Sequence, residues 1–96
     1  MDIRSVRHRG LRYLIEEDSP RFLQPTLVDR VRKILTVLIL AETIADFRSA
    51  SPPGWRTHQL SGDRAGDWSV SVTENWRITF REVDGFIDHL NLEDYH

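Results

Sequence analysis

Two parts of the sequence hold side chains that could exchange protons near neutral pH. His58 lies in a short segment ahead of an alternating stretch, and Asp94, Tyr95 and His96 stand together at positions 94–96. Histidine is the side chain best suited to proton exchange at this pH. Two histidines, with a carboxylate to orient one of them, supply a general base and a general acid. A single histidine in a strand is more often structural, so this pattern alone leaves that alternative open.

A second set of side chains suits a phosphate backbone. Polar residues alternate with apolar ones in two consecutive stretches, which places cations and hydroxyls on one face of a predicted hairpin: Ser69, Ser71, Thr73, Arg77, Thr79 and Arg81. Arginine can donate two parallel hydrogen bonds to a phosphate. An ordinary solvated sheet face has the same pattern, and that alternative also stays open.

The composition excludes several kinds of chemistry. The chain has 96 residues and no cysteine, so disulfides, thiolate metal sites and cysteine nucleophiles are ruled out. No HxxxH or HExxH spacing occurs among the four histidines, and we expect neither a metal nor another cofactor. The longest apolar run, Val37 to Ala41, is far short of a membrane span. The first ten residues lack the apolar core of a signal peptide, so we expect a cytoplasmic protein with no membrane contact.

Apolar periodicity predicts an α+β fold. Residues 2–6 could form a short strand, and a helix is expected from about His8 to Asp18. A second helix follows Pro25 and runs to about Leu40, with residues 41–47 as a short helical extension. Beyond the break at 51–54 the period changes to two.

The second half of the chain predicts a meander of strands. Strands are expected around 57–60, 68–73, 76–81 and 86–92, with tight connections at 73–75 and at Asp84-Gly85. We therefore predict one domain over residues 1–96, with two N-terminal helices packed on a C-terminal antiparallel sheet of about four to five strands. Alternation places Trp68 and Trp76 in the core and leaves the polar face open to solvent.

Several motifs along the chain resemble the HigB toxins, a branch of the RelE/ParE superfamily. The matching segments are His8 to Leu11, Trp55 to Asp63, Ala65 to Val72, Asn75 to Phe80 and Glu93 to His96. The strand with the sequence NWRITF and the terminal DYH are the most specific of these. The resemblance implies a RelE-like fold and cleavage of mRNA on the ribosome without a metal. It also implies inhibition by a HigA-like helix-turn-helix antitoxin, which joins the toxin to operator DNA.

The resemblance also implies which residues form the site. The family's active-site positions fall on His58, Asp94, Tyr95 and His96, and its strand arginine falls on Arg77. Cleavage by the neighbouring 2′-hydroxyl needs a base, an acid and cations at the phosphate. Asp94 and His96 are our first candidates for proton transfer and His58 is the next, with the order of action left open.

Two departures from the family pattern remove cations. Ser61 and Thr73 stand where relatives commonly have a basic residue, and Arg64 and Arg81 could replace that charge. The loss slightly favours a non-catalytic protein that only pairs with an antitoxin as a DNA-binding repressor. A ParE-like inhibitor of DNA gyrase is the third reading, although it gives the terminal DYH no purpose.

Overall fold

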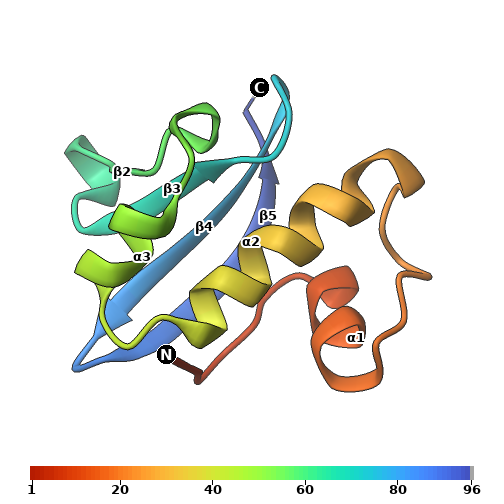
Figure 1. The fold of residues 1–96 in the computed structure, drawn as a ribbon. Helices are drawn as coiled ribbons and strands as arrows, with labels where there is room; N and C mark the ends of the chain where they lie inside the picture. The colour runs from red at the N-terminus through yellow and green to blue at the C-terminus, as the bar shows by residue number, and fades with distance from the viewer. Residues whose placement is uncertain (96) are drawn as a thin grey trace.

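The computed structural model describes residues 1–95, in which helices pack on one side of a five-stranded mixed sheet (Figure 1). The α-helices are α1 (Arg9–Glu17), α2 (Val28–Leu40) and α3 (Ile44–Ala50). The 3₁₀ turns are η1 (Pro25–Leu27), η2 (Pro53–Trp55) and η3 (Gly62–Arg64). The strands are β1 (Asp2–Ile3), β2 (His58–Gln59), β3 (Asp67–Ser71), β4 (Trp76–Val83) and β5 (Phe86–Asp94), in the order β1-β5-β4-β3-β2. The predicted α+β fold is confirmed.

The two long helices form where the periodicity placed them. The imidazole of His8 accepts a hydrogen bond from the amide of Gly10 at 2.9 Å and so caps the start of α1. α2 follows the turn at Pro25 and buries one apolar stripe: Val31, Ile34, Leu35 and Leu38. Each such side chain contributes about 1.5–3 kcal/mol when it is fully buried. α2 thereby fixes the helical layer against the sheet.

The third helix differs from the prediction. Residues 41–47 were expected to extend α2, but Ala41 is extended and a separate helix begins after Thr43. The hydroxyl of Thr43 accepts a hydrogen bond from the amide of Asp46 at 3.1 Å, which starts α3 as a new helix. Phe47 of α3 is fully buried, and its ring lies 5.9 Å from that of Phe80. α3 therefore covers the β3–β4 end of the sheet.

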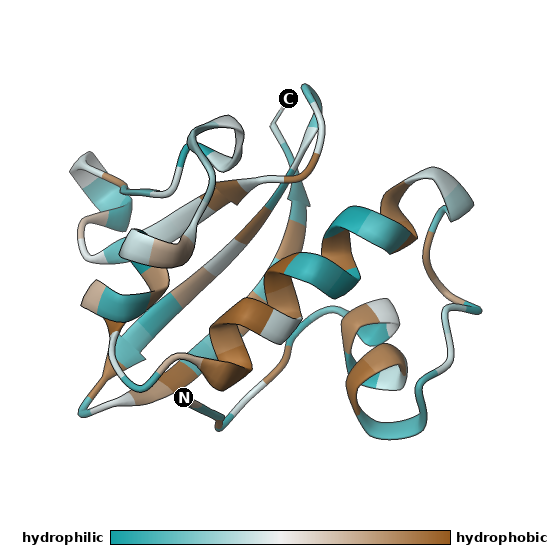
Figure 2. Ribbon diagram, in the orientation of Figure 1, coloured by the Kyte–Doolittle hydropathy of each residue, from teal (hydrophilic) through white to brown (hydrophobic). Residues whose placement is uncertain are grey.

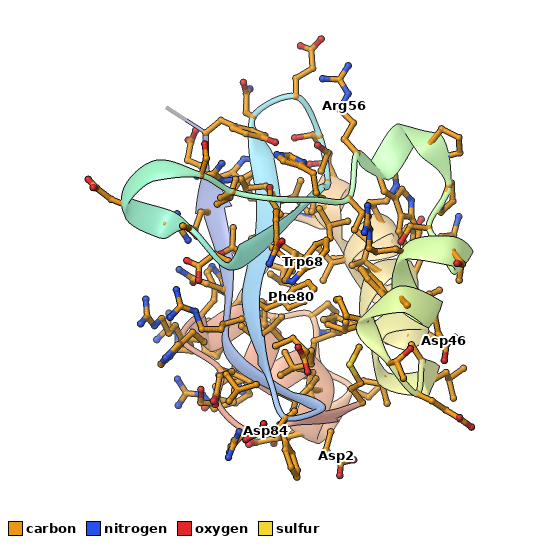
Figure 3. The ribbon with its side chains drawn as sticks, turned by 90° about the vertical axis from the view of Figure 1, so that its left-hand side faces the viewer. Asp2, Asp46, Arg56, Trp68, Phe80 and Asp84 are labelled. Atoms are coloured by element: carbon orange, nitrogen blue, oxygen red, sulfur yellow. The ribbon has the colours of Figure 1, made fainter. Side chains whose placement is uncertain are left out.

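The core lies between the helices and the inward face of the sheet. Figure 3 shows Trp68 and Phe80 pointing from the strands toward the helices, and Figure 2 shows hydrophobic segments on α2 and on the strands behind it. Trp68 is buried, as predicted, whereas Trp76 is half-buried against the edge of the core. None of the helices among residues 1–95 is long and apolar enough to cross a membrane.

The N-terminal segment makes the sheet mixed rather than purely antiparallel. β1 pairs in parallel with β5, and the amide of Arg4 donates to the carbonyl of Ile87 at 2.7 Å. The pairing of β4 with β5 contains a bulge. Thr79 pairs with Asn91 and Arg81 with Asp88, so two residues of β5, His89 and Leu90, lie opposite Phe80 alone. His89 adopts a left-handed backbone conformation at this bulge (φ 56°).

The outer face of the sheet is less exposed than the alternation predicted. Ser69 and Thr79 are 0% and 1% exposed, so the prediction of a fully solvated polar face is wrong at its centre. Arg64, from the η3 turn, reaches the β5 carboxylate of Glu93 with both terminal nitrogens at 2.8 Å. Sequence alternation assigns a side chain to a face, but it cannot indicate that a loop returns over that face.

Candidate active site

Strand register brings most of the predicted site residues onto the outer face of the sheet. His58 pairs with Ser69 on the next strand, while Ser71 pairs with Arg77. Arg77 in turn pairs with Glu93. Because side chains directly opposite one another share a face, these residues lie on one face of the sheet in two neighbouring rows. One row joins His58, Ser69 and Thr79, and the other joins Ser71, Arg77 and Glu93.

Tyr95 lies over Arg77 and extends back toward β3. The Arg77 guanidinium carbon is 4.7 Å from the centre of the Tyr95 ring, and the Tyr95 hydroxyl is 3.4 Å from the Ser71 hydroxyl. Hydrogen bonding to Ser71, with a smaller contribution from the charge of Arg77, lowers the pKa of Tyr95 below its usual value. The structure thus brings Tyr95 and Arg77 together, and it makes the Tyr95 phenol a stronger acid than usual.

The imidazole of His58 is oriented by the backbone two residues before it. Its Nδ1 lies 2.6 Å from the carbonyl oxygen of Arg56, and a carbonyl can only accept a hydrogen bond. Nδ1 therefore carries the proton, and in the neutral ring Nε2 is left as the proton acceptor. Arg56 holds a left-handed conformation (φ 49°) as it ends η2, which shapes the backbone at this carbonyl.

Three buried polar atoms near these rows lack a hydrogen-bond partner within residues 1–95. They are Oγ1 of Thr57, Oγ of Ser69 and Nε of Arg77. An unsatisfied buried donor costs about 1–3 kcal/mol, so a ligand that accepts these hydrogen bonds would recover that cost. Thr57 was not predicted, and Ser69 was predicted only as one of the polar residues of the sheet face, not as a neighbour of His58. The pairing of Ser69 with His58 is the signal that identifies Ser69 as a site residue, and it requires the register.

Carboxylates hold the two other predicted phosphate-binding arginines. Arg64 forms an ion pair with Glu93 at 2.8 Å and a second with Asp67 at 3.2 Å. Arg81 forms an ion pair with Asp67 at 2.9 Å, and the hydroxyl of Thr79 donates to Glu93. Arg64 therefore joins the η3 turn to β3 and β5 across the outer face of the sheet. Of the three predicted arginines, Arg77 alone has a buried Nε without a partner in the described chain.

Glu93 gives this cluster a pH-dependent stability. Hydrogen bonding to Arg64 lowers the pKa of the Glu93 carboxyl below its ordinary value. A lowered folded-state pKa stabilises the fold above the unfolded pKa, and this contribution is lost as the pH falls through the folded value. We therefore expect Glu93→Gln to lower the unfolding free energy at pH 7 and to flatten its decline between about pH 5 and pH 3. Urea unfolding across that range measures both. If the unfolding free energy of Glu93→Gln depends on pH as steeply as that of the wild type, the prediction is wrong. Glu74→Gln, which changes an exposed glutamate, is the control and should keep the wild-type pH dependence.

Asp94 and His96 are the other two predicted residues of the terminal motif. Asp94 pairs with Trp76, so it alternates onto the opposite face from Glu93 and Arg77, whereas His96 lies outside the described residues.

No group of three or more histidine, aspartate or glutamate side chains within residues 1–95 could hold a metal. A groove of about 620 Å³ lies beside Tyr95, and a volume of that size accommodates a small-molecule ligand. Its lining includes Arg30, Arg56, Ser71, Thr73 and Tyr95.

The chain has a curated relative that matches it from end to end. Residues 4–96 match the model of the family described as RelE-like toxin of type II toxin-antitoxin system HigB. The endoribonuclease HigB of Proteus vulgaris is 37% identical over 94 residues, which cover 98% of this chain and 99% of that protein.

Solved structures of the same fold are more distant in sequence. The YoeB/ParE toxin from Agrobacterium tumefaciens superposes with a TM-score of 0.60 at 14% identity and covers all of both chains. YafQ of E. coli gives a TM-score of 0.57 at 12% identity, over 96% of this chain and 93% of that one. The likeness to these structures shows the RelE-like fold, and the family match over nearly every residue shows that the chain belongs to the HigB family of RelE-like toxins of type II toxin-antitoxin systems.

Proposed function

We propose that the protein is an mRNA endoribonuclease that blocks translation as the toxin of a toxin-antitoxin pair. The observation that carries this proposal is that His58, Ser69 and Arg77 share the outer face of the sheet, with Ser69 opposite His58 and the Arg77 guanidinium against the Tyr95 ring. The Ser69 hydroxyl and the Arg77 guanidinium suit the oxygens of a phosphate, and the His58 imidazole suits its attacking hydroxyl. The activity in the name of the Proteus vulgaris relative agrees with this chemistry.

The proposed reaction uses the 2′-hydroxyl of the RNA as the nucleophile. Nε2 of His58 takes the 2′-hydroxyl proton while the 2′-oxygen bonds to the adjacent phosphorus. Arg77 and Ser69 donate hydrogen bonds to the phosphorane oxygens, whose charge grows in the transition state. The P–O5′ bond then breaks, and Tyr95 gives its proton to the departing 5′-oxygen. Asp94 and His96 remain predicted members of the site on the family motif.

The partners follow from the same proposal. A solved structure of the E. coli DinJ–YafQ toxin-antitoxin complex shares the toxin fold at a TM-score of 0.59. For this chain we propose a HigA-like helix-turn-helix antitoxin, which alone contacts operator DNA. The ribosome presents the mRNA to the site, and the protein acts in the cytoplasm.

The test is cleavage of one mRNA with and without ribosomes. We expect growth arrest when the protein is expressed without its antitoxin, and new mRNA 5′ ends only in samples that contain ribosomes. Primer extension on naked and ribosome-bound mRNA measures this. Equal cleavage of naked RNA would remove the ribosome from the proposal. Growth arrest without RNA cleavage, with gyrase inhibited, would replace the proposed ribonuclease with the ParE-like function. The absence of both growth arrest and cleavage would favour the non-catalytic repressor.

A further inference from the structure

A small basic cavity lies beside the candidate site, on the outer face of the sheet. It has a volume of about 180 Å³. Its lining combines Phe80 with four basic residues, a hydroxyl and one acid: Arg7, Arg64, Arg81, His89, Thr79 and Asp67. Figure 3 shows nitrogen-bearing side chains gathered on the side of the sheet away from the helices. Ligand pockets for drug-sized molecules span about 300–1,000 Å³, so this cavity suits one small polyatomic group.

The charges in the cavity are not balanced. Asp67 pairs with Arg64 and Arg81, and Glu93 takes the remaining donors of Arg64. Neither the Arg7 guanidinium nor the His89 imidazole has an ion pair or hydrogen bond within the described chain. Arg7 therefore brings an uncompensated positive charge, and an anion with several acceptor oxygens would complement it.

Two distant segments are held in place to form the cavity. The amide of Arg7 donates to the carbonyl of Leu90 at 2.7 Å, which fixes the N-terminal segment alongside β5. The bulge places His89 in the left-handed region, a conformation that costs a residue other than glycine free energy. Its backbone amide is held there by the hydroxyl of Ser5 at 2.8 Å. The structure thus maintains a strained residue where it presents an imidazole to this cavity.

We infer that this cavity binds a phosphate of the same RNA strand that is cleaved, through Arg7 and His89. The inference rests on the proposed function. Arg81, in the cavity lining, is four residues from Arg77 along β4, or about 13 Å. Thr79, also in the lining, lies between them. A strand of RNA with its scissile phosphate at Arg77 can therefore pass along β4 and place a later phosphate in the cavity.

The first experiment measures binding alone. The probe is a short RNA with 2′-O-methyl groups, which cannot be cleaved, so a failure of catalysis does not affect the result. Each phosphate contact that is lost should reduce the magnitude of the slope of log K against log salt concentration by about 0.7 for a single strand. We expect this reduction in Arg7→Gln and none in Arg12→Gln, which removes an exposed arginine of α1 outside the cavity. Equal slopes for wild type, Arg7→Gln and Arg12→Gln would overturn the inference.

The second experiment identifies the phosphate. Uncharged methylphosphonates replace the phosphates of the probe one at a time. One position away from the scissile phosphate should weaken binding to the wild type, with little further effect in Arg7→Gln or His89→Ala. If no position behaves in this way, the strand does not occupy the cavity. If Arg7→Gln binds the probe normally but loses ribosome or antitoxin affinity, the occupant is another RNA or an acidic peptide, and the inference is wrong. Circular dichroism on each variant separates these outcomes from unfolding.

Discussion

Arg77→Ala is expected to slow RNA cleavage by about 10²-fold or more, the scale for one preorganised transition-state contact. The guanidinium lies against the Tyr95 ring, and its buried Nε has no hydrogen-bond partner in the described chain. Such a donor is already oriented before the phosphate gains charge, so its loss acts on the chemical step. Single-turnover cleavage of ribosome-bound mRNA measures the rate.

Two further variants define what Arg77 contributes. Arg77→Lys keeps the charge but loses the planar fork, so we expect a rate between those of the wild type and Arg77→Ala. Arg12→Ala removes an exposed arginine elsewhere and should cleave at the wild-type rate. If Arg77→Ala stays within a few-fold of the wild type, Arg77 is only a surface cation and the proposed mechanism loses its main phosphate contact.

His58→Ala is expected to reduce the single-turnover rate by about 10²–10⁴-fold, the usual contribution of a positioned general base. The Arg56 carbonyl keeps the proton on Nδ1, so the ring presents Nε2 to the 2′-hydroxyl. The side chain is exposed on a two-residue edge strand, and its loss should leave the melting temperature nearly unchanged.

The matched control for this prediction is the next residue. Gln59→Ala also removes an exposed side chain from β2, and it should leave the cleavage rate unchanged. A His58→Ala rate equal to that of Gln59→Ala would transfer the base to another group, with the terminal Asp94 and His96 as the candidates from the sequence. A large loss in both variants would indicate that β2 itself is disturbed.

Local patterns in the sequence predicted the elements well because short-range spacing determines them. The stripe on α2 and the alternation around Ile78 are visible in the residues themselves. The separate helix α3 was not predicted, because apolar residues continue beyond Leu40 and favoured an extension of α2. The new helix start depends on a single hydroxyl, that of Thr43. The parallel pairing of β1 was also out of reach, since it joins residues more than eighty positions apart.

The site residues were likewise predicted from local motifs, but not the contacts between residues far apart in the sequence. The family motifs pointed to His58, Arg77 and Tyr95, and the register assembles these three on one face of the sheet. The motifs gave no sign that Arg64 is held by Glu93 and Asp67, because an ion pair across 29 positions depends on how a loop returns. The unsatisfied hydroxyl of Ser69 was hidden for a related reason: burial is a property of the assembled sheet.

The position of β5 has a consequence for how the protein emerges during its own synthesis. β5 follows the other strands along the chain, yet it lies inside the sheet, between β1 and β4. The ribosome releases a chain from its N-terminus onward, so β1 and β4 leave the exit tunnel before their common neighbour. Until β5 follows, Arg77 lacks both its β5 partner, Glu93, and the Tyr95 ring. A nascent chain therefore has no assembled site with which to attack the message that encodes it, and the nuclease becomes competent only once β5 has emerged.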